Sequence, residues 1–131
     1  MRKTLFLFVG ALLLASCHES IEERAQREAA DYTRRNCPTP YINDTRTDSI
    51  VFDEATHTYT YYCSVRGMID DAAFVNEHKG EMTSQLAANL RQDTNMRVYK
   101  EAGFNFAYIV TSTKNKGEVL YLVKFTPKDY E

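Results

Sequence analysis

The chain has 131 residues, and charged side chains make up 26% of them, with a formal net charge of −2. This length suits one small domain with a modest hydrophobic core. The mildly acidic balance argues against the clustered basic surface with which proteins bind a phosphate backbone, so we expect no nucleic-acid partner.

The first sixteen residues have the layout of a secretory signal peptide. Two cations, Arg2 and Lys3, precede the uncharged apolar block from Thr4 to Ala15. This block is shorter than the about 20 apolar residues that a membrane-spanning helix needs. We therefore expect residues 1–16 to be removed, which leaves 14 basic and 18 acidic side chains and a net charge of −4.

The end of this segment resembles the lipobox of bacterial lipoproteins. Leu14, Ala15 and Ser16 supply an aliphatic and two small residues, and Cys17 follows them. The resemblance implies that a diacylglyceryl group is attached to the Cys17 thiol and that cleavage leaves Cys17 as the acylated first residue. More than one acyl chain, such as palmitate, anchors a protein stably. The alternative is an ordinary signal peptide that is cut off and lost.

The same resemblance predicts the location of the mature protein. In Gram-negative lipoproteins an aspartate after the cysteine favours retention in the inner membrane, and here that residue is His18. We therefore expect a protein of the cell envelope that is anchored in the outer membrane and faces either the periplasm or the cell surface. Residues 17–20 then form a lipidated tether, and residues 21–131 form a single domain.

The first predicted elements of that domain are a helix and a hairpin. The segment from Ser20 to Asn36 is rich in helix formers, with Ser20 placed as its cap, but its apolar stripe is narrow. We expect this helix to be held less firmly than the strands. Strands are predicted at Asp48–Phe52 and Thr58–Val65, and the second strand alternates so that Tyr61, Cys63 and Val65 face the core.

A second helix is predicted at Asp70–Arg91, with a polar gap around Gly80, and a second hairpin at Phe104–Ser112 and Glu118–Phe125. The predicted order is α-β-β-α-β-β. This order indicates an α+β fold in which the helices pack on one face of a four-stranded antiparallel sheet.

A second resemblance covers nearly all of this domain. The segment "CPTPYINDTRTDS", followed by an aromatic hairpin, a helix and a terminal hairpin, is similar to small uncharacterised exported bacterial proteins. The resemblance supports a single domain and implies no site.

Two cysteines remain once Cys17 is assigned to lipid, and export places them where thiols can be oxidised. A Cys37–Cys63 disulfide is the favoured expectation, worth on the order of 3 kcal/mol. The alternative is that Cys63 is a small buried hydrophobe and Cys37 a loop residue, too far apart to meet.

The sequence contains no assembled catalytic motif, so we expect no catalytic residues, no metal and no cofactor. His18, His57 and His78 each stand alone, with Glu54 or Glu77 as the nearest acidic neighbours. A Cys63–His78 pair is conceivable, but the strand pattern points the thiol into an apolar face. A further group of carboxylates reads as a helix cap and a solvated face: Asp70, Asp71, Glu77 and Glu81.

Binding is the favoured function, although the sequence leaves the question of an enzyme open. Tyr62 lies on the outward parity of its strand and is the best candidate for an exposed binding aromatic. Asp48–Ile50 matches a short acceptor pattern for O-glycosylation, with a plain strand start as the alternative. We expect a lipid-anchored envelope protein that acts without catalysis and contacts another envelope protein. The alternative is a small periplasmic enzyme or enzyme inhibitor with its site in the cleft between sheet and helix.

Overall fold

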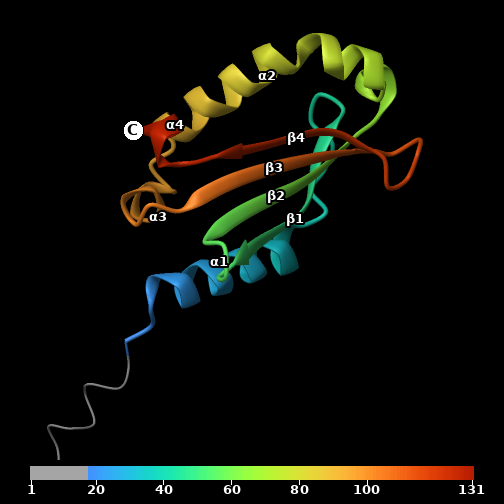
Figure 1. Ribbon diagram of the computed structural model, residues 1–131. Helices are drawn as coiled ribbons and strands as arrows, with labels where there is room; N and C mark the ends of the chain where they lie inside the picture. Colours follow the sequence, from blue (N-terminus) through green and yellow to red (C-terminus); the bar gives the residue numbers. More distant parts are fainter. Residues whose placement is uncertain (1–17) are drawn as a thin grey trace, which may run out of the picture.

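The computed structural model describes residues 18–131, which form a four-stranded sheet with one long helix along each of its two edges (Figure 1). Cys17 and the predicted signal peptide lie outside the described residues. The elements in chain order are α1 (Ile21–Asn36), β1 (Thr45–Asp53), β2 (Thr58–Val65), a 3-10 turn η1 (Gly67–Ile69), α2 (Ala72–Gln92), α3 (Arg97–Glu101), β3 (Asn105–Ser112), β4 (Val119–Phe125) and α4 (Pro127–Tyr130).

The four strands form one sheet in the order β1-β2-β3-β4, but the sheet is mixed. The two hairpins, β1–β2 and β3–β4, pair antiparallel as predicted. The central pair, β2 and β3, is parallel, with Thr58 beside Asn105 and Val65 beside Ser112. The α+β class and the four strands are therefore confirmed, whereas the prediction of a fully antiparallel sheet is wrong.

The length of α2 explains the parallel pair. Its 21 residues extend about 32 Å at about 1.5 Å per residue, and the eight residues of β2 extend about 26 Å. One helix therefore carries the chain from the end of β2 back to the level at which β2 began. A strand that starts there must run in the same direction as β2, because a parallel pair needs such a crossover.

Both long helices begin at side-chain caps. The Ser20 hydroxyl accepts the Glu23 N–H at 3.0 Å, and the Asp71 carboxylate accepts the Ala73 N–H at 3.1 Å. The polar gap around Gly80 does not interrupt α2, since Gly80 is exposed and a side chain there would meet no atom within 4 Å. The short helices α3 and α4 were not predicted, because single helical turns leave too weak a periodic signal.

The core lies between the sheet and the helices and has two parts. The larger cluster joins Ala25 and Ala29 of α1 to Ala87 and Leu90 of α2 through aromatic side chains of the sheet and of α3. Because both helices share this cluster, they cover the same face, as predicted. Tyr99, Phe104 and Phe106 are its largest fully buried side chains. The smaller cluster, at the other end of the sheet, contains Val65, Val75, Val110 and Tyr121.

Helix α1 also protects the free edge of β1. The Thr33 hydroxyl donates to the Ile50 carbonyl at 3.0 Å and accepts the Ile50 N–H at 2.9 Å. The Thr39 hydroxyl accepts the N–H of Thr47 on the same edge at 2.9 Å. These hydroxyls satisfy backbone groups that an edge strand would otherwise offer to another chain.

Candidate functional site

A groove lies between α2 and the end of the sheet that α1 does not reach. Its volume is about 550 Å³, and thirteen residues line it. Thr33, in the last turn of α1, bonds Ile50 in the middle of β1, so the sheet beyond that level has no cover from α1. The sheet is therefore covered by two helices at one end and by α2 alone at the other, which leaves the groove open.

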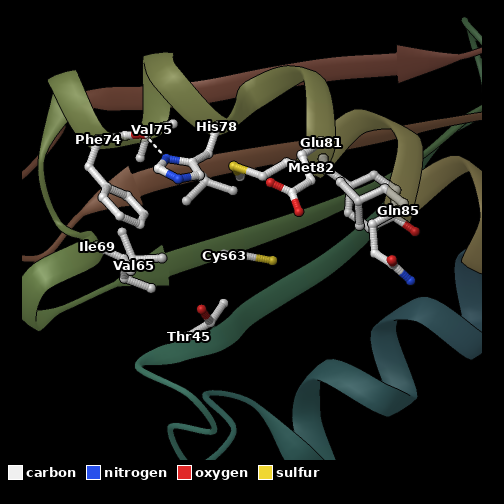
Figure 2. A pocket seen from close by; sticks show the side chains of 13 residues that line it. Thr45, Cys63, Val65, Ile69, Phe74, Val75, His78, Glu81, Met82 and Gln85 are labelled. Atoms are coloured by element: carbon white, nitrogen blue, oxygen red, sulfur yellow. Dashed lines mark hydrogen bonds between the residues drawn. The ribbon is translucent and has the colours of Figure 1, made fainter.

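The floor and walls of the groove are mostly apolar (Figure 2). Cys63 and Val65 of β2 and Tyr108 and Val110 of β3 form the floor. Side chains of α2 point toward these strands and form one wall, and Thr45 of β1 lies on the opposite side. A cavity of this size and lining falls within the about 300–1,000 Å³ typical of sites that bind apolar ligands.

The floor continues into the centre of the sheet through a pair of tyrosines. Tyr61 and Tyr108, neighbours on β2 and β3, stack with ring centroids 4.7 Å apart and an interplanar angle of 7°. Burial raises the pKa of Tyr108 to about 12 and raises the pKa of Tyr61 further. Both phenols are therefore neutral at physiological pH and act as flat, weakly polar surfaces.

Two strongly exposed apolar residues are neighbours of residues that line the groove. Met68 of η1 is 88% exposed and Ile42 is 71% exposed, the two highest values among the exposed large hydrophobic residues of the described chain. Ile42 is hydrogen-bonded to Thr45, and Met68 precedes Ile69, so each adjoins a residue that lines the groove. Apolar exposure next to an apolar groove is characteristic of binding surfaces. Sequence analysis missed both residues, because each stands in a turn without a periodic pattern.

Cys63, His78 and Glu81 all line the groove, but they do not form a catalytic arrangement. Burial raises the pKa of the Cys63 thiol, which disfavours the thiolate form that a nucleophile needs. The His78 ring stacks on Phe74, with centroids 4.2 Å apart, and its Nδ1 lies 2.8 Å from the Phe74 carbonyl oxygen. Within residues 18–131 no hydrogen bond joins the thiol to the imidazole, and no ion pair includes Glu81.

The predicted disulfide is not supported, since Cys37 and Cys63 are free thiols in the structure. Each thiol has a threonine neighbour, Thr33 for Cys37 and Thr47 for Cys63. Besides burial, Cys37 also contributes to the raised pKa of Cys63, so the two thiols lie in the same region without being bonded. Cys63 points into the groove, whereas Cys37 follows the last turn of α1 and caps it through its backbone. The alternative, in which the two cysteines are not bridged, agrees with the structure, although Cys63 is only partly buried.

The histidines and acidic residues singled out in the sequence are dispersed. His57 Nε2 lies 3.4 Å from Glu22 Oε1, and His78 lies in the groove. Across residues 18–131 no group of three or more His, Cys, Asp or Glu side chains is arranged to hold a metal ion. Glu54 and Glu77 are exposed, and Asp71 caps α2.

Asp70 has a structural role that its sequence context did not reveal. Its buried carboxylate accepts the Ser112 hydroxyl at 2.5 Å and the backbone N–H groups of Thr113 and Lys114 at 3.1 and 2.9 Å. These bonds, above all the one from Ser112, lower the pKa of Asp70. They fasten the β3–β4 turn to the segment that leads into α2, so the carboxylate holds one end of the groove in place.

The sheet face opposite the helices carries Tyr62, which is 39% exposed. It stands in a cross-strand row with Ile109 and with Leu122, which is 63% exposed. The position of Tyr62 agrees with the outward parity predicted for it. Ser49, in the predicted glycosylation pattern, pairs with Tyr62 on β1 and is partly exposed.

The described residues contain no helix with the length and hydropathy needed to cross a bilayer.

Comparisons with known proteins identify a family and a fold. Residues 20–121 match the family described as "Domain of unknown function (DUF8479)". No curated protein matches the sequence. The crystal structure of a candidate secreted protein from Pseudomonas aeruginosa is similar with a TM-score of 0.67 and 14% identity, covering 87% of this chain and 100% of that one. The pilotin EpsS of the Vibrio vulnificus type 2 secretion system is similar with a TM-score of 0.64 and 14% identity, covering 84% of this chain and 91% of that one. At this identity the likeness shows a shared fold.

Proposed function

This chain belongs to the DUF8479 family of domains of unknown function, and we propose that it is a lipid-anchored, non-enzymatic protein of the cell envelope whose groove binds an apolar segment of a partner protein. The observation that carries the proposal is the apolar groove, together with the exposure of Ile42 and Met68, which adjoin the lining residues Thr45 and Ile69. Burying such surfaces against a partner is favourable by about 25 cal/mol for each Å² removed from water.

The anchor rests on the likeness of Leu14–Cys17 to a lipobox. In the structure, α1 begins at Ile21, so a lipid on Cys17 stands a few residues from the folded domain. Glu19 is already held to α1, because its carboxylate accepts two bonds from the Arg27 guanidinium, at 2.7 and 2.9 Å. Each residue between the anchor and the folded domain adds at most about 3.5 Å of chain. The domain would therefore stay close to the membrane.

With a lipid on Cys17, we expect the groove to lie at the end of the domain farther from the anchor. The start of α1 lies beside the β1–β2 turn, since Glu22 approaches His57. The groove mouth lies at the opposite end of these strands, at Thr45 and Val65. We therefore expect the mouth to be accessible to a soluble segment of another envelope protein.

The shared fold agrees with this role without defining it. Of the two similar structures, one is a candidate secreted protein and the other a pilotin of a secretion system. These descriptions, of a secreted protein and of a secretion-system component, support the proposal of an exported protein. The outer membrane remains the expected location, from His18 after the lipobox cysteine.

A matched pair of tryptophan variants tests the proposal. The chain contains no tryptophan, so Met82→Trp places one fluorescent ring in the groove and Leu122→Trp places one on the open sheet face. We expect the full-length protein with Met82→Trp to lose co-purification of its partner from envelope membranes, whereas Leu122→Trp keeps it. Urea unfolding of both variants checks that each is folded. Equal co-purification with both folded variants would contradict binding in the groove.

A second candidate function is thiol chemistry by a small enzyme, because Cys63, His78 and Glu81 line the same groove. The raised pKa of the thiol opposes this reading. The Cys63→Ala variant separates the two functions. If the groove only binds, this variant should still bind its partner. If Cys63 is a catalytic nucleophile, the variant should fold but lose its activity in the envelope.

A further inference from the structure

We infer that the segment bound in the groove is an α-helix that presents apolar side chains to the floor and a lysine or arginine to Glu81. This inference rests on the proposed function and specifies the partner that the groove selects. It follows from three properties of the groove: the backbone groups of its lining elements are already hydrogen-bonded, its length suits a short helix, and its rim carries a negative charge.

In the described chain, the floor strands and the helix that line the groove have no free backbone N–H or C=O groups with which an extended peptide could pair. The floor strands β2 and β3 are paired on both sides, β2 with β1 and β3, and β3 with β2 and β4. The backbone of α2 is bonded within the helix. A peptide that enters must therefore satisfy its own N–H and C=O groups, since leaving them unpaired in an apolar site is costly. An α-helix does so internally, whereas strand addition needs a free edge.

The groove has the length of a short helical face. Its floor runs from the level of Tyr108 to that of Val65, four residues along β2, which is about 13 Å. Its α2 wall runs from Val75 to Leu86, which is about 16 Å. Two to three helical turns of about 5.4 Å fit this span. Such a helix contacts the groove through apolar residues spaced i, i+4 and i+7.

The charge comes from Glu81, which is the one acidic or basic side chain among the thirteen lining residues apart from His78. It stands midway along the α2 wall, exposed at the rim, and Figure 2 shows it beside Met82 and Gln85. No described lysine or arginine pairs with it. A bound helix with a cation at this level gains an ion pair, whereas one with an acidic residue there meets like charge.

Glu77 provides the control within the same helix. It lies one turn before Glu81, is exposed, and lines neither this groove nor a second cavity, of about 510 Å³, between α2 and β4. Glu77→Lys and Glu81→Lys change the net charge equally. A difference between them therefore reports the groove and not the overall charge of the protein.

The experiment selects helices from a displayed library of three-turn peptides. Each peptide has Leu, Ile or Phe at the groove-facing positions and random residues at the flanking positions. The target is the full-length lipidated protein in nanodiscs. Peptides that also bind the Met82→Trp variant are discarded, so that the remaining peptides are those that need the open groove. We expect selection to enrich lysine or arginine at one flanking position. The best such peptide should bind Glu81→Lys about fivefold more weakly, as expected for one partly exposed ion pair, and Glu77→Lys with an unchanged Kd.

Exchanging the peptide lysine for glutamate should restore binding to Glu81→Lys. Groove-dependent peptides without any charge preference, or equal weakening by both lysine variants, would overturn the inference and leave the proposed function standing. Failure to select any peptide that Met82→Trp excludes would overturn both.

Discussion

Replacing Thr33 with valine tests how α1 is held to the sheet. The Thr33 hydroxyl satisfies both the N–H and the C=O of Ile50 on the outer edge of β1. Valine has nearly the same shape, so the packing around the side chain is kept while both hydrogen bonds are lost. Two backbone groups in a partly buried setting are then left without their protein partner.

The expected loss of stability follows from these two bonds. A hydrogen bond in a folded protein contributes about 1 kcal/mol net, and an unpaired buried group costs about 1–3 kcal/mol. Because Thr33 is only partly buried, water can replace some of what is lost. We therefore expect Thr33→Val to lower the free energy of unfolding by about 2 kcal/mol. Thr33→Ser keeps the hydroxyl and should lose less than half of that.

Urea unfolding followed by circular dichroism measures both values on one scale. Hydrogen exchange locates the effect, and protection should fall in α1 and β1 while it persists at Phe104–Val110. The narrow apolar stripe of α1 predicts this uneven response, since Ala25 and Ala29 are its only fully buried side chains. If Thr33→Val proved as stable as the wild type, the hydroxyl bridge would not be holding the edge.

Three further outcomes are expected. Cys17→Ala should move the protein out of the membrane fraction, and an intact mass of the mature wild type without lipid would contradict the anchor. Because hydrogen bonds lower the pKa of Asp70, their stabilisation is complete above the ordinary carboxyl pKa and is lost as the pH falls through the folded value. The urea midpoint of the wild type should therefore approach that of Asp70→Asn under acid, and a gap independent of pH would be inconsistent with this. Without reductant, an alkylating reagent should modify both Cys37 and Cys63 in the unfolded protein. In the native protein it should modify Cys37 first. Mass mapping that finds the two cysteines bridged would contradict the free thiols.

The local elements were readable from the sequence because each carries its own signal. Alternating side chains in Thr58–Val65 predict the strand and the inward direction of Cys63, and Ser20 predicts the start of α1. Both hairpins follow from short polar connections between strands. These features depend on residues near one another in the chain.

The pairing of β2 with β3 was not readable in the same way, because 39 residues separate Val65 from Asn105. The direction of β3 depends on where α2 returns the chain, and that depends on packing. The groove was hidden for a related reason. Most of its lining residues are apolar and look like ordinary core material, and the opening exists because α1 stops short of the Thr45 end of the sheet.

The central claim is that the groove, and not the open sheet face, meets the partner in the envelope. Site-specific photocrosslinking in living cells tests it most directly, with a benzophenone side chain placed at Gln85 on the groove rim or at Leu122 on the open face. Both positions are exposed, so neither substitution disturbs the core. The account predicts one discrete crosslinked protein from position 85 and none from position 122. Crosslinks from position 122 alone would contradict it.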